Sequence, residues 1–368
     1  MKFSRFIPYC LIFLVAISCS TNQVDPLKQE KYITELRGLG YPFSQAGLMK
    51  AAEKGDTEAI LLFIDAGKDL NAEDSGTALT SAVAFNKVEA VKILLDNGAD
   101  VNGQSYSGIP ISNNSRINYT DMVDVFIFKG ADVNGQPFNG TPLDIASRMG
   151  YADIVRLLIE KGASVNKMSG DGATPLLDAV LKGNTQVVKL LLDNKADPNF
   201  RQPQTNDSIL ISAAVRGNAE IVQMLINYGA RINYRTMGGL SALDWALLRN
   251  NKDAAKVLLD NGAEIYNKGA NSYRPLIEAF ERNDFELAKM LVDHGADVKW
   301  KIQKEMPLIV WCSKRNMDKC VKFLVENKAD INARDNYGMT ALDYAIQNYN
   351  KAIESMLKTP ITDNNGNK

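Results

Sequence analysis

The side chains that most often carry catalysis or metal binding are scarce in this sequence. It holds one histidine, His294, and four cysteines, Cys10, Cys19, Cys312 and Cys320. A single histidine excludes His-rich metal sites and most His-dependent triads, because such sites gather several nitrogen or sulfur ligands. His294 stands in an Asp-His-Gly string typical of a helix end, where an imidazole interacts with the negative end of the helix dipole. We therefore expect a structural role for His294 and no metal site.

The carboxylates and glycines show no pattern of an active site. The aspartates recur in a Gly-Ala-Asp string that repeats along the chain, whereas a general acid/base pair would be unique to one place. Gly-Gly at 238–239 is followed by no Gly-Lys-Ser/Thr sequence of a phosphate loop. With 42 Lys+Arg against 43 Asp+Glu, the net charge of −1 gives no general attraction to nucleic acid. The sequence predicts a protein that is not an enzyme, needs no cofactor and binds no nucleic acid.

The first nineteen residues have the layout of an export signal. Two cations precede an apolar run over residues 6–17, which is too short to cross a bilayer, since a helix needs about 20 residues for that. The run leads into Val-Ala-Ile-Ser-Cys, which ends at Cys19 and resembles the lipobox of bacterial lipoproteins, with Ala16 where leucine is commonest. The resemblance implies cleavage before Cys19, its lipidation, and an anchor in the inner or outer membrane facing the periplasm or the cell surface. The alternatives are an ordinary cleaved signal and an uncleaved apolar N-terminus.

Most of the remaining chain is one repeated unit. The string Gly-Ala-Asp-Val-Asn stands at 98–102 and 130–134, and relatives of it recur at intervals of 31 to 34 residues. About nineteen residues before each string, a Leu or Ile begins a helical segment. In some units Thr-Pro precedes it, and these two residues suit the N-cap and the first position of a helix. Gly or Asn at the end of that segment suits a left-handed helix terminus, and an apolar helix follows. The pattern predicts ten units of helix, tight turn, helix and extended turn.

These units resemble the ankyrin repeat, with its Thr-Pro-Leu-His and Gly-Ala-Asp-Val-Asn signatures. The histidine of the first signature is absent, and Asp144, Asp244 and Asp343 replace it in three units. We expect this difference to alter local hydrogen bonds in the turns but not the fold. The resemblance implies an all-α ankyrin-repeat solenoid of about ten helix-turn-helix units joined by extended β-turns. The expected organisation is a lipoprotein signal peptide 1–18, a polar spacer 19–43 with one short helix near 28–36, ankyrin repeats 44–358, and a frayed tail 359–368.

Some positions depart from the pattern, and two cysteines fall in one unit. In the third unit Asn114 replaces a spacing alanine, which is either a loosened joint or drift, and drift is favoured. Lys195 and Lys328 replace the helix-ending glycine, at a cost of about 1 kcal/mol each if they adopt a left-handed conformation. Cys312 and Cys320 fall on the two helices of the ninth unit. Free buried thiols are favoured over a disulfide there, because free cysteine packs as a small hydrophobe, although an oxidising compartment would permit a bridge.

One set of residues could bind a partner. Basic residues stand once per unit just before the turn between helices, at intervals of 33 or 34 residues, and we call them the basic ladder: Lys182, Arg216, Arg249, Arg282 and Arg315. In ankyrin domains this end of the first helix borders the concave face, which with the turn tips usually contacts partners. Aligned guanidinium groups would favour carboxylates or phosphates. The alternative is that the ladder has no function. This alternative is favoured, because exposed positions generally tolerate long polar residues.

Apolar and aromatic side chains near the ladder complete the candidate surface, because aromatic residues, Met and Arg are enriched in protein interfaces. Candidates on the same face are Phe85, Met149, Leu181, Trp245 and Leu248. Candidates at the turn tips are Tyr106, Phe138, Met237, Tyr273 and Tyr337.

The sequence therefore predicts an exported, lipid-anchored protein whose ankyrin repeats bind another protein and carry out no chemistry. The basic ladder would suit a partner with an acidic surface. One alternative is a dedicated inhibitor, protector or regulatory subunit of a single envelope enzyme, and another is a cytosolic ankyrin adaptor. A catalytic protein would need a domain outside the repeats or a unique polar cluster, and the sequence has neither.

Overall fold

The computed structural model describes most of the repeated region. The described residues are 25–73, 76–103, 111, 120–135, 140–265, 274–302 and 306–358. Cys19, Tyr106, Asn114, Phe138 and Tyr273 lie outside them, as do the expected signal peptide and tail.

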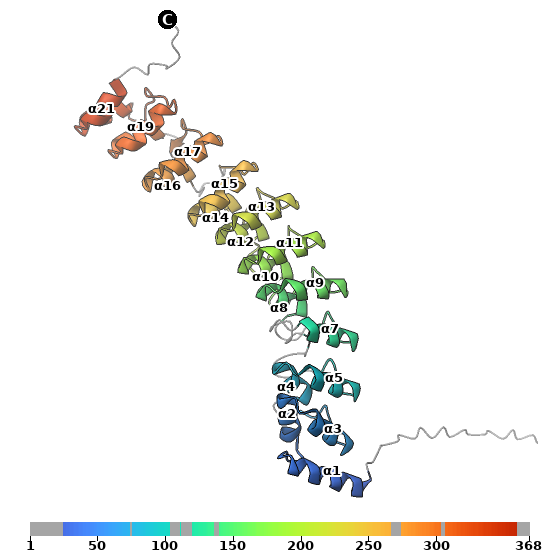
Figure 1. Ribbon diagram of the computed structural model, residues 1–368. Coiled ribbons are helices and arrows are strands. Elements are labelled where there is room, and N and C mark those ends of the chain that lie inside the picture. Colours follow the sequence, from blue (N-terminus) through green and yellow to red (C-terminus); the bar gives the residue numbers. More distant parts are fainter. Residues whose placement is uncertain are drawn as a thin grey trace, which may run out of the picture. The chain divides into compact units, whose positions relative to one another are not determined.

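The described part of the chain is built of helix pairs, which confirms the predicted helix-turn-helix repeat (Figure 1). The first helices of the repeats are α2 (Gln45–Lys54), α4 (Ala78–Ala84), α8 (Pro142–Met149), α10 (Pro175–Lys182), α12 (Ile209–Arg216), α14 (Ala242–Leu248), α16 (Pro275–Glu281), α18 (Leu308–Lys314) and α20 (Ala341–Gln347). The second helices are α3 (Thr57–Asp65), α5 (Val88–Asp96), α7 (Thr120–Phe128), α9 (Ala152–Glu160), α11 (Thr185–Asp193), α13 (Ala219–Asn227), α15 (Lys252–Asp260), α17 (Phe285–Asp293), α19 (Asp318–Glu326) and α21 (Lys351–Lys358).

The chain separates into two compact units, and the border between them falls in the third repeat. Asn114 lies outside the described residues, so drift at that position stays a prediction. The first unit contains α2 to α5 and, before them, α1 (Pro26–Gly38). Helix α1 packs against α3 and buries Leu36 completely. The short helix expected in the spacer is therefore present, and it is part of the packed core rather than a free linker.

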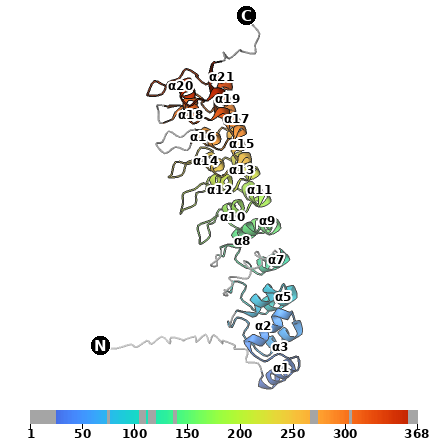
Figure 2. The same cartoon turned by 90° about the vertical axis from the view of Figure 1, so that its left-hand side faces the viewer.

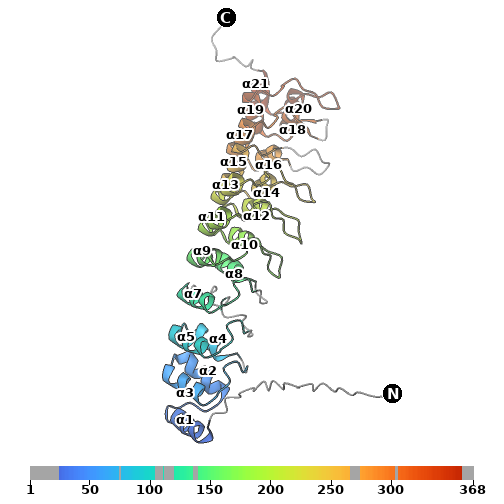
Figure 3. The ribbon, with the colours of Figure 1, turned by 90° about the vertical axis from the view of Figure 1, so that its right-hand side faces the viewer.

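Within the second unit, the first helices from α10 to α20 form one row and the second helices form a row beside them. The extended turns project from the row of first helices, away from the second helices (Figures 2 and 3). One of these turns contains a short antiparallel pair of strands, β1 (Lys301–Ile302) and β2 (Met306–Pro307). No helix in the described part of the chain is long and apolar enough to span a membrane.

Helix α8 shows how the repeated residues define each first helix. Thr141 Oγ1 accepts a hydrogen bond from the Asp144 amide at 3.2 Å, and Asp144 Oδ2 accepts from the Thr141 amide at 2.8 Å. Pro142 occupies the first helical position, where no N–H is needed. Gly150 ends the helix with a φ of +82°, a left-handed conformation that glycine adopts without strain. Aspartate thus closes a capping box, and α14 and α20 are closed in the same way.

Asparagine side chains link the extended turns of neighbouring repeats. Asn166 Nδ2 donates to the Lys195 carbonyl at 3.0 Å, and its Oδ1 accepts from the Asp197 amide at 2.8 Å. We call this pair of bonds an asparagine clamp. Equivalent clamps are formed by Asn71, Asn134, Asn199 and Asn233. The last residue of the Gly-Ala-Asp-Val-Asn string therefore holds the next repeat.

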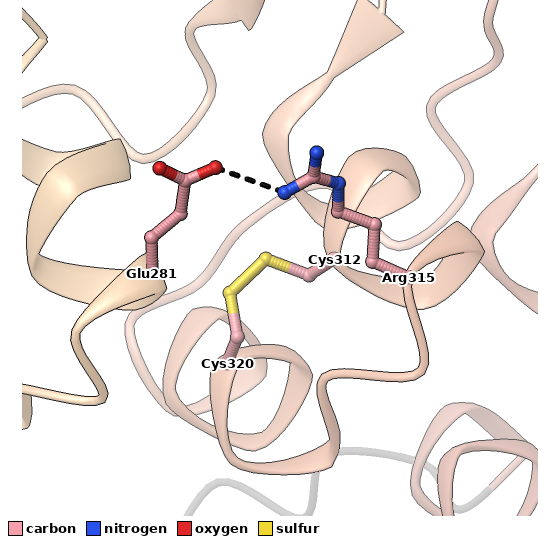
Figure 4. Close-up of a disulfide and its surroundings, with 4 residues drawn as sticks. All are labelled: Glu281, Cys312, Arg315 and Cys320. Atoms are coloured by element: carbon pink, nitrogen blue, oxygen red, sulfur yellow. Dashed lines mark hydrogen bonds and ion pairs between the residues drawn. A yellow bond between two sulfur atoms is a disulfide. The ribbon is translucent and has the colours of Figure 1, made fainter.

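The two lysines at helix ends follow the expectation, whereas the two cysteines of the ninth repeat do not. Lys195 and Lys328 adopt φ angles of 67° and 63°, so the predicted left-handed helix ends are confirmed. The expectation of free thiols was wrong, because Cys312 of α18 and Cys320 of α19 form a disulfide (Figure 4). The turn between these two helices brings the cysteine Cα atoms to 6.0 Å, within the usual range for a bridge.

Candidate protein-binding surface

The basic ladder occupies equivalent positions at the C-terminal ends of five successive first helices. Lys182 and Arg216 are the last residues of α10 and α12. Arg249, Arg282 and Arg315 are the residues that cap α14, α16 and α18. All five side chains are exposed. A cation is favourable at each of these sites, because the C-terminus of a helix carries partial negative charge.

One end of the ladder is neutralised within the protein. Arg315 Nη1 lies 2.9 Å from Glu281 Oε1 of the preceding repeat (Figure 4). The Arg315 guanidinium also lies over the Trp311 ring, 4.7 Å from its centroid. Arg282 Nη2 lies 3.3 Å from Glu278 Oε2 in its own helix. These two arginines therefore have carboxylates of their own.

The other three ladder residues differ. Lys182, Arg216 and Arg249 form no ion pair with any carboxylate in the described part of the chain. The Arg249 guanidinium lies over the Trp245 ring at 5.8 Å from its centroid, which leaves its charge uncompensated. We call Lys182, Arg216 and Arg249 the unpaired stretch of the ladder.

A groove of about 490 Å³ lies beside Arg216 and Arg249, between α10, α12 and α14. Its apolar lining comes from Leu181, Ile211, Val215 and Trp245. Its polar lining comes from Asp207, Ser212, Arg216 and Arg249. The indole N–H of Trp245 is buried and has no hydrogen-bond acceptor. The structure therefore brings together two ladder arginines and two of the predicted apolar residues.

Comparison with known proteins identifies the family. A model of ankyrin repeats, described as three copies, matches residues 13–105, 113–202, 197–269 and 276–367. The chain belongs to the ankyrin-repeat family. Among solved structures it is similar to the crystal structure of the human ASB11 ankyrin repeat domain, with a TM-score of 0.52 and 27% sequence identity. That match covers 59% of this chain and 98% of the other, and a search of curated proteins finds no match.

Membership in the ankyrin-repeat family implies binding to another protein without catalysis. The single histidine has a structural role within the fold. His294 caps α17, with Nδ1 2.8 Å from the Met290 carbonyl and Nε2 2.9 Å from Asp260 Oδ1, and these two contacts raise the pKa of His294. In the described residues, no group of three His, Cys, Asp or Glu side chains could hold a metal ion.

The other predicted contact residues within the described ranges do not line the groove. Phe85 follows α4 in the first unit, Met149 ends α8, and Leu248 ends α14, and all three are exposed. Met237 and Tyr337 are strongly exposed in extended turns, as expected for turn tips. These positions were predicted as exposed contact points, and their part in binding stays a prediction.

A buried polar cluster was missed by the sequence reasoning. Asp144 is fully buried, and burial raises its pKa to about 6. Burial also raises the pKa of Asp178, against the opposing effect of Arg148, whose Nη2 lies 2.9 Å from Asp178 Oδ2. In the sequence Arg148 stands one position before the place that a ladder residue would occupy in its repeat. This offset was the feature that could have separated Arg148 from the ladder. Its guanidinium serves the interior of the array instead of the binding surface.

Proposed function

We propose that this ankyrin-repeat protein is exported, is lipid-anchored through Cys19 in the bacterial cell envelope, and binds another protein that presents an acidic surface to the basic ladder. The observation that carries the binding proposal is the unpaired stretch beside an apolar groove. Exposed cations next to apolar and aromatic side chains are the composition of protein interfaces. The fold supplies the rigid surface, and the partner supplies any chemistry.

Two observations support export. The string before Cys19 resembles a lipobox. The disulfide between Cys312 and Cys320 also fits a compartment outside the cytosol, because disulfides persist where thiols are not kept reduced. An acyl anchor would hold the chain on a membrane through its buried methylene groups, at about 0.8 kcal/mol each.

The anchor is tested by metabolic labelling with a fatty acid. Wild-type protein should carry the label, and Cys19→Ala should lose it. Cys10→Ala is the matched control, because Cys10 lies in the same signal segment but not at the lipobox, and it should keep the label. A wild-type protein without label, or label that persists in Cys19→Ala, contradicts the lipid anchor.

The binding role is tested by recovering partners from native envelope extract with the full chain in mild detergent. The baits are wild type and a variant with Lys182, Arg216 and Arg249 changed to Glu. One dominant protein recovered by wild type and lost by the variant supports binding through the ladder. Recovery by both baits leaves binding standing but removes the ladder from it. No enrichment above an untagged control argues against the binding role itself.

The same experiment separates the proposed binder from a dedicated regulator. If the dominant partner is an enzyme whose activity changes on adding purified chain, the protein is an inhibitor, protector or regulatory subunit. Several partners of unrelated activity would instead indicate a general adaptor.

A further inference from the structure

We propose that the groove between α10, α12 and α14 binds an extended acidic segment of the partner protein, with an apolar side chain in the groove and carboxylates on Arg216 and Arg249. This inference rests on the proposed binding function and specifies the partner's chemistry. It differs from a general acidic surface because it assigns one segment, one groove and two arginines.

The first argument is the contrast along the ladder. Arg282 and Arg315 occupy the same register as Arg216 and Arg249, yet each has a carboxylate within 3.3 Å. Glu278 and Glu281 provide those carboxylates from α16. The helices α12 and α14 place no glutamate in their last turns, where the sequences read AAVR and WALL. Arg216 and Arg249 therefore have no carboxylate in their own last helical turns and are left for an external one.

The second argument is the size and lining of the groove. The groove has a volume of about 490 Å³ and is open to solvent on one side. The groove therefore fits one or two side chains of a segment. Leu181, Ile211, Val215 and Trp245 present carbon to such a side chain.

The third argument is the spacing of neighbouring repeats. Packed helices lie about 8–10 Å apart, so equivalent residues of α12 and α14 are separated by about this distance. In an extended segment of polyproline II type, residues three apart lie on one face and about 9 Å from each other. Glutamates at every third position would therefore reach Arg216 and Arg249 together. A compact acidic loop would not keep this spacing.

Asp207 limits where the carboxylates of a partner can bind in the groove. It is a carboxylate in the lining, and it would repel a partner carboxylate placed beside it. The two arginines still outnumber it, and Lys182 adds a third cation one repeat away. The favoured position for the partner's carboxylates is therefore along the line of Arg216 and Arg249, at the ends of the helices, with the apolar side chain pointing into the groove.

The test measures fluorescence anisotropy of a short labelled peptide with glutamate at every third residue and leucines between, added to the full chain in detergent. The control peptide has glutamine in place of each glutamate. The groove variant is Arg216→Gln with Arg249→Gln. Its matched control is Arg282→Gln with Arg315→Gln, which removes the same charge from ladder positions that have carboxylates already. Thermal unfolding of both variants checks that the fold is intact.

We expect saturable binding of the glutamate peptide, at least about tenfold weaker binding to the groove variant, and binding within about twofold of wild type for the matched control. Addition of salt should weaken wild-type binding. Equal affinity for the glutamine peptide, equal losses in both variants, or no binding by wild type overturns the proposal. If inorganic polyphosphate displaces the labelled peptide equally well from wild type and from both variants, the binding is a nonspecific effect of charge. This result would also overturn the proposal.

The failure of this proposal is separable from failure of the proposed function. If the groove variant still recovers the envelope partner as well as wild type does, then the binding role stands and the groove assignment is wrong. If neither recovers a partner, the binding role itself is contradicted.

Discussion

Changing Asp144 to asparagine should remove a pH dependence from the stability of this array. Asp144 is fully buried, and its Oδ2 accepts hydrogen bonds from the Thr141 amide and hydroxyl, each at 2.8 Å. Burial is the largest cause that raises its pKa from 3.8 to about 6, against the hydrogen bonds from Thr141 that lower it. Asparagine keeps an acceptor for Thr141 and cannot ionise.

The sign follows from the raised pKa. The folded state binds the proton more tightly than the unfolded chain, so the stability that protonated Asp144 contributes is fully present below its unfolded pKa of 3.8. It is lost as the pH rises through about 6. The difference between the two pKa values corresponds to about 3 kcal/mol. Asp178 and Arg148 are present in both proteins, and their charges contribute to the pKa of Asp144 that the substitution removes.

The assay is urea unfolding followed by far-ultraviolet circular dichroism across this pH range. The unfolding free energy of Asp144→Asn relative to wild type should rise by about 3 kcal/mol as the pH rises through the folded-state pKa. Asp343→Asn is the matched control, because Asp343 closes the same capping box in α20 but has a lowered pKa. Its curve should run parallel to wild type above the unfolded pKa. Parallel curves for Asp144→Asn, or a change of opposite sign, would refute the reasoning.

Two further predictions concern stability. Replacing Cys312 and Cys320 together with Ala should lower the unfolding free energy by about 2.5 kcal/mol, the loop-entropy value for cysteines eight residues apart. Reductant should destabilise wild type and leave the double variant unchanged, and an equal response of both proteins would contradict this origin. Lys195→Gly should raise the unfolding free energy by about 1 kcal/mol, because Lys195 adopts a φ of 67° that glycine adopts without strain. If the same urea titration shows a lower unfolding free energy for Lys195→Gly, the contacts of the lysine side chain stabilise the fold by more than its left-handed backbone destabilises it.

The repeat could be predicted from sequence because its determinants are local. Thr141, Pro142 and Gly150 act within one helix, and their neighbours in the chain suffice to define where it begins and ends. The left-handed Lys195 followed from its position in the string. The replacement of histidine by aspartate predicted a change in the hydrogen bonds of the turn. It did not predict that the carboxylate would be buried in a capping box, because burial depends on the adjacent repeats.

For the candidate site, the sequence predicted which residues stand at equivalent positions of the repeats, but not which contacts their side chains make. Equal spacing placed Arg216 and Arg315 at equivalent helix ends, and the structure agrees. The spacing did not reveal that Arg315 is paired with Glu281, because that contact joins two repeats and depends on side-chain geometry. The groove was missed for the same reason, since it forms between three helices. The disulfide was missed because a buried free cysteine and a buried bridged one fit the same sequence pattern.

The asparagine clamps have a consequence for how the array comes apart. The clamp of Asn233 holds the next turn, but the sequence has Tyr266 and Lys299 at the following two clamp positions. In a repeat array each unit is held only by its neighbours, so opening starts where a joint is weakest. We therefore expect fraying to begin in the last repeats and to slow at Asn233. The covalent link between α18 and α19 would keep that helix pair together while it is detached, so that it returns to the array as one piece.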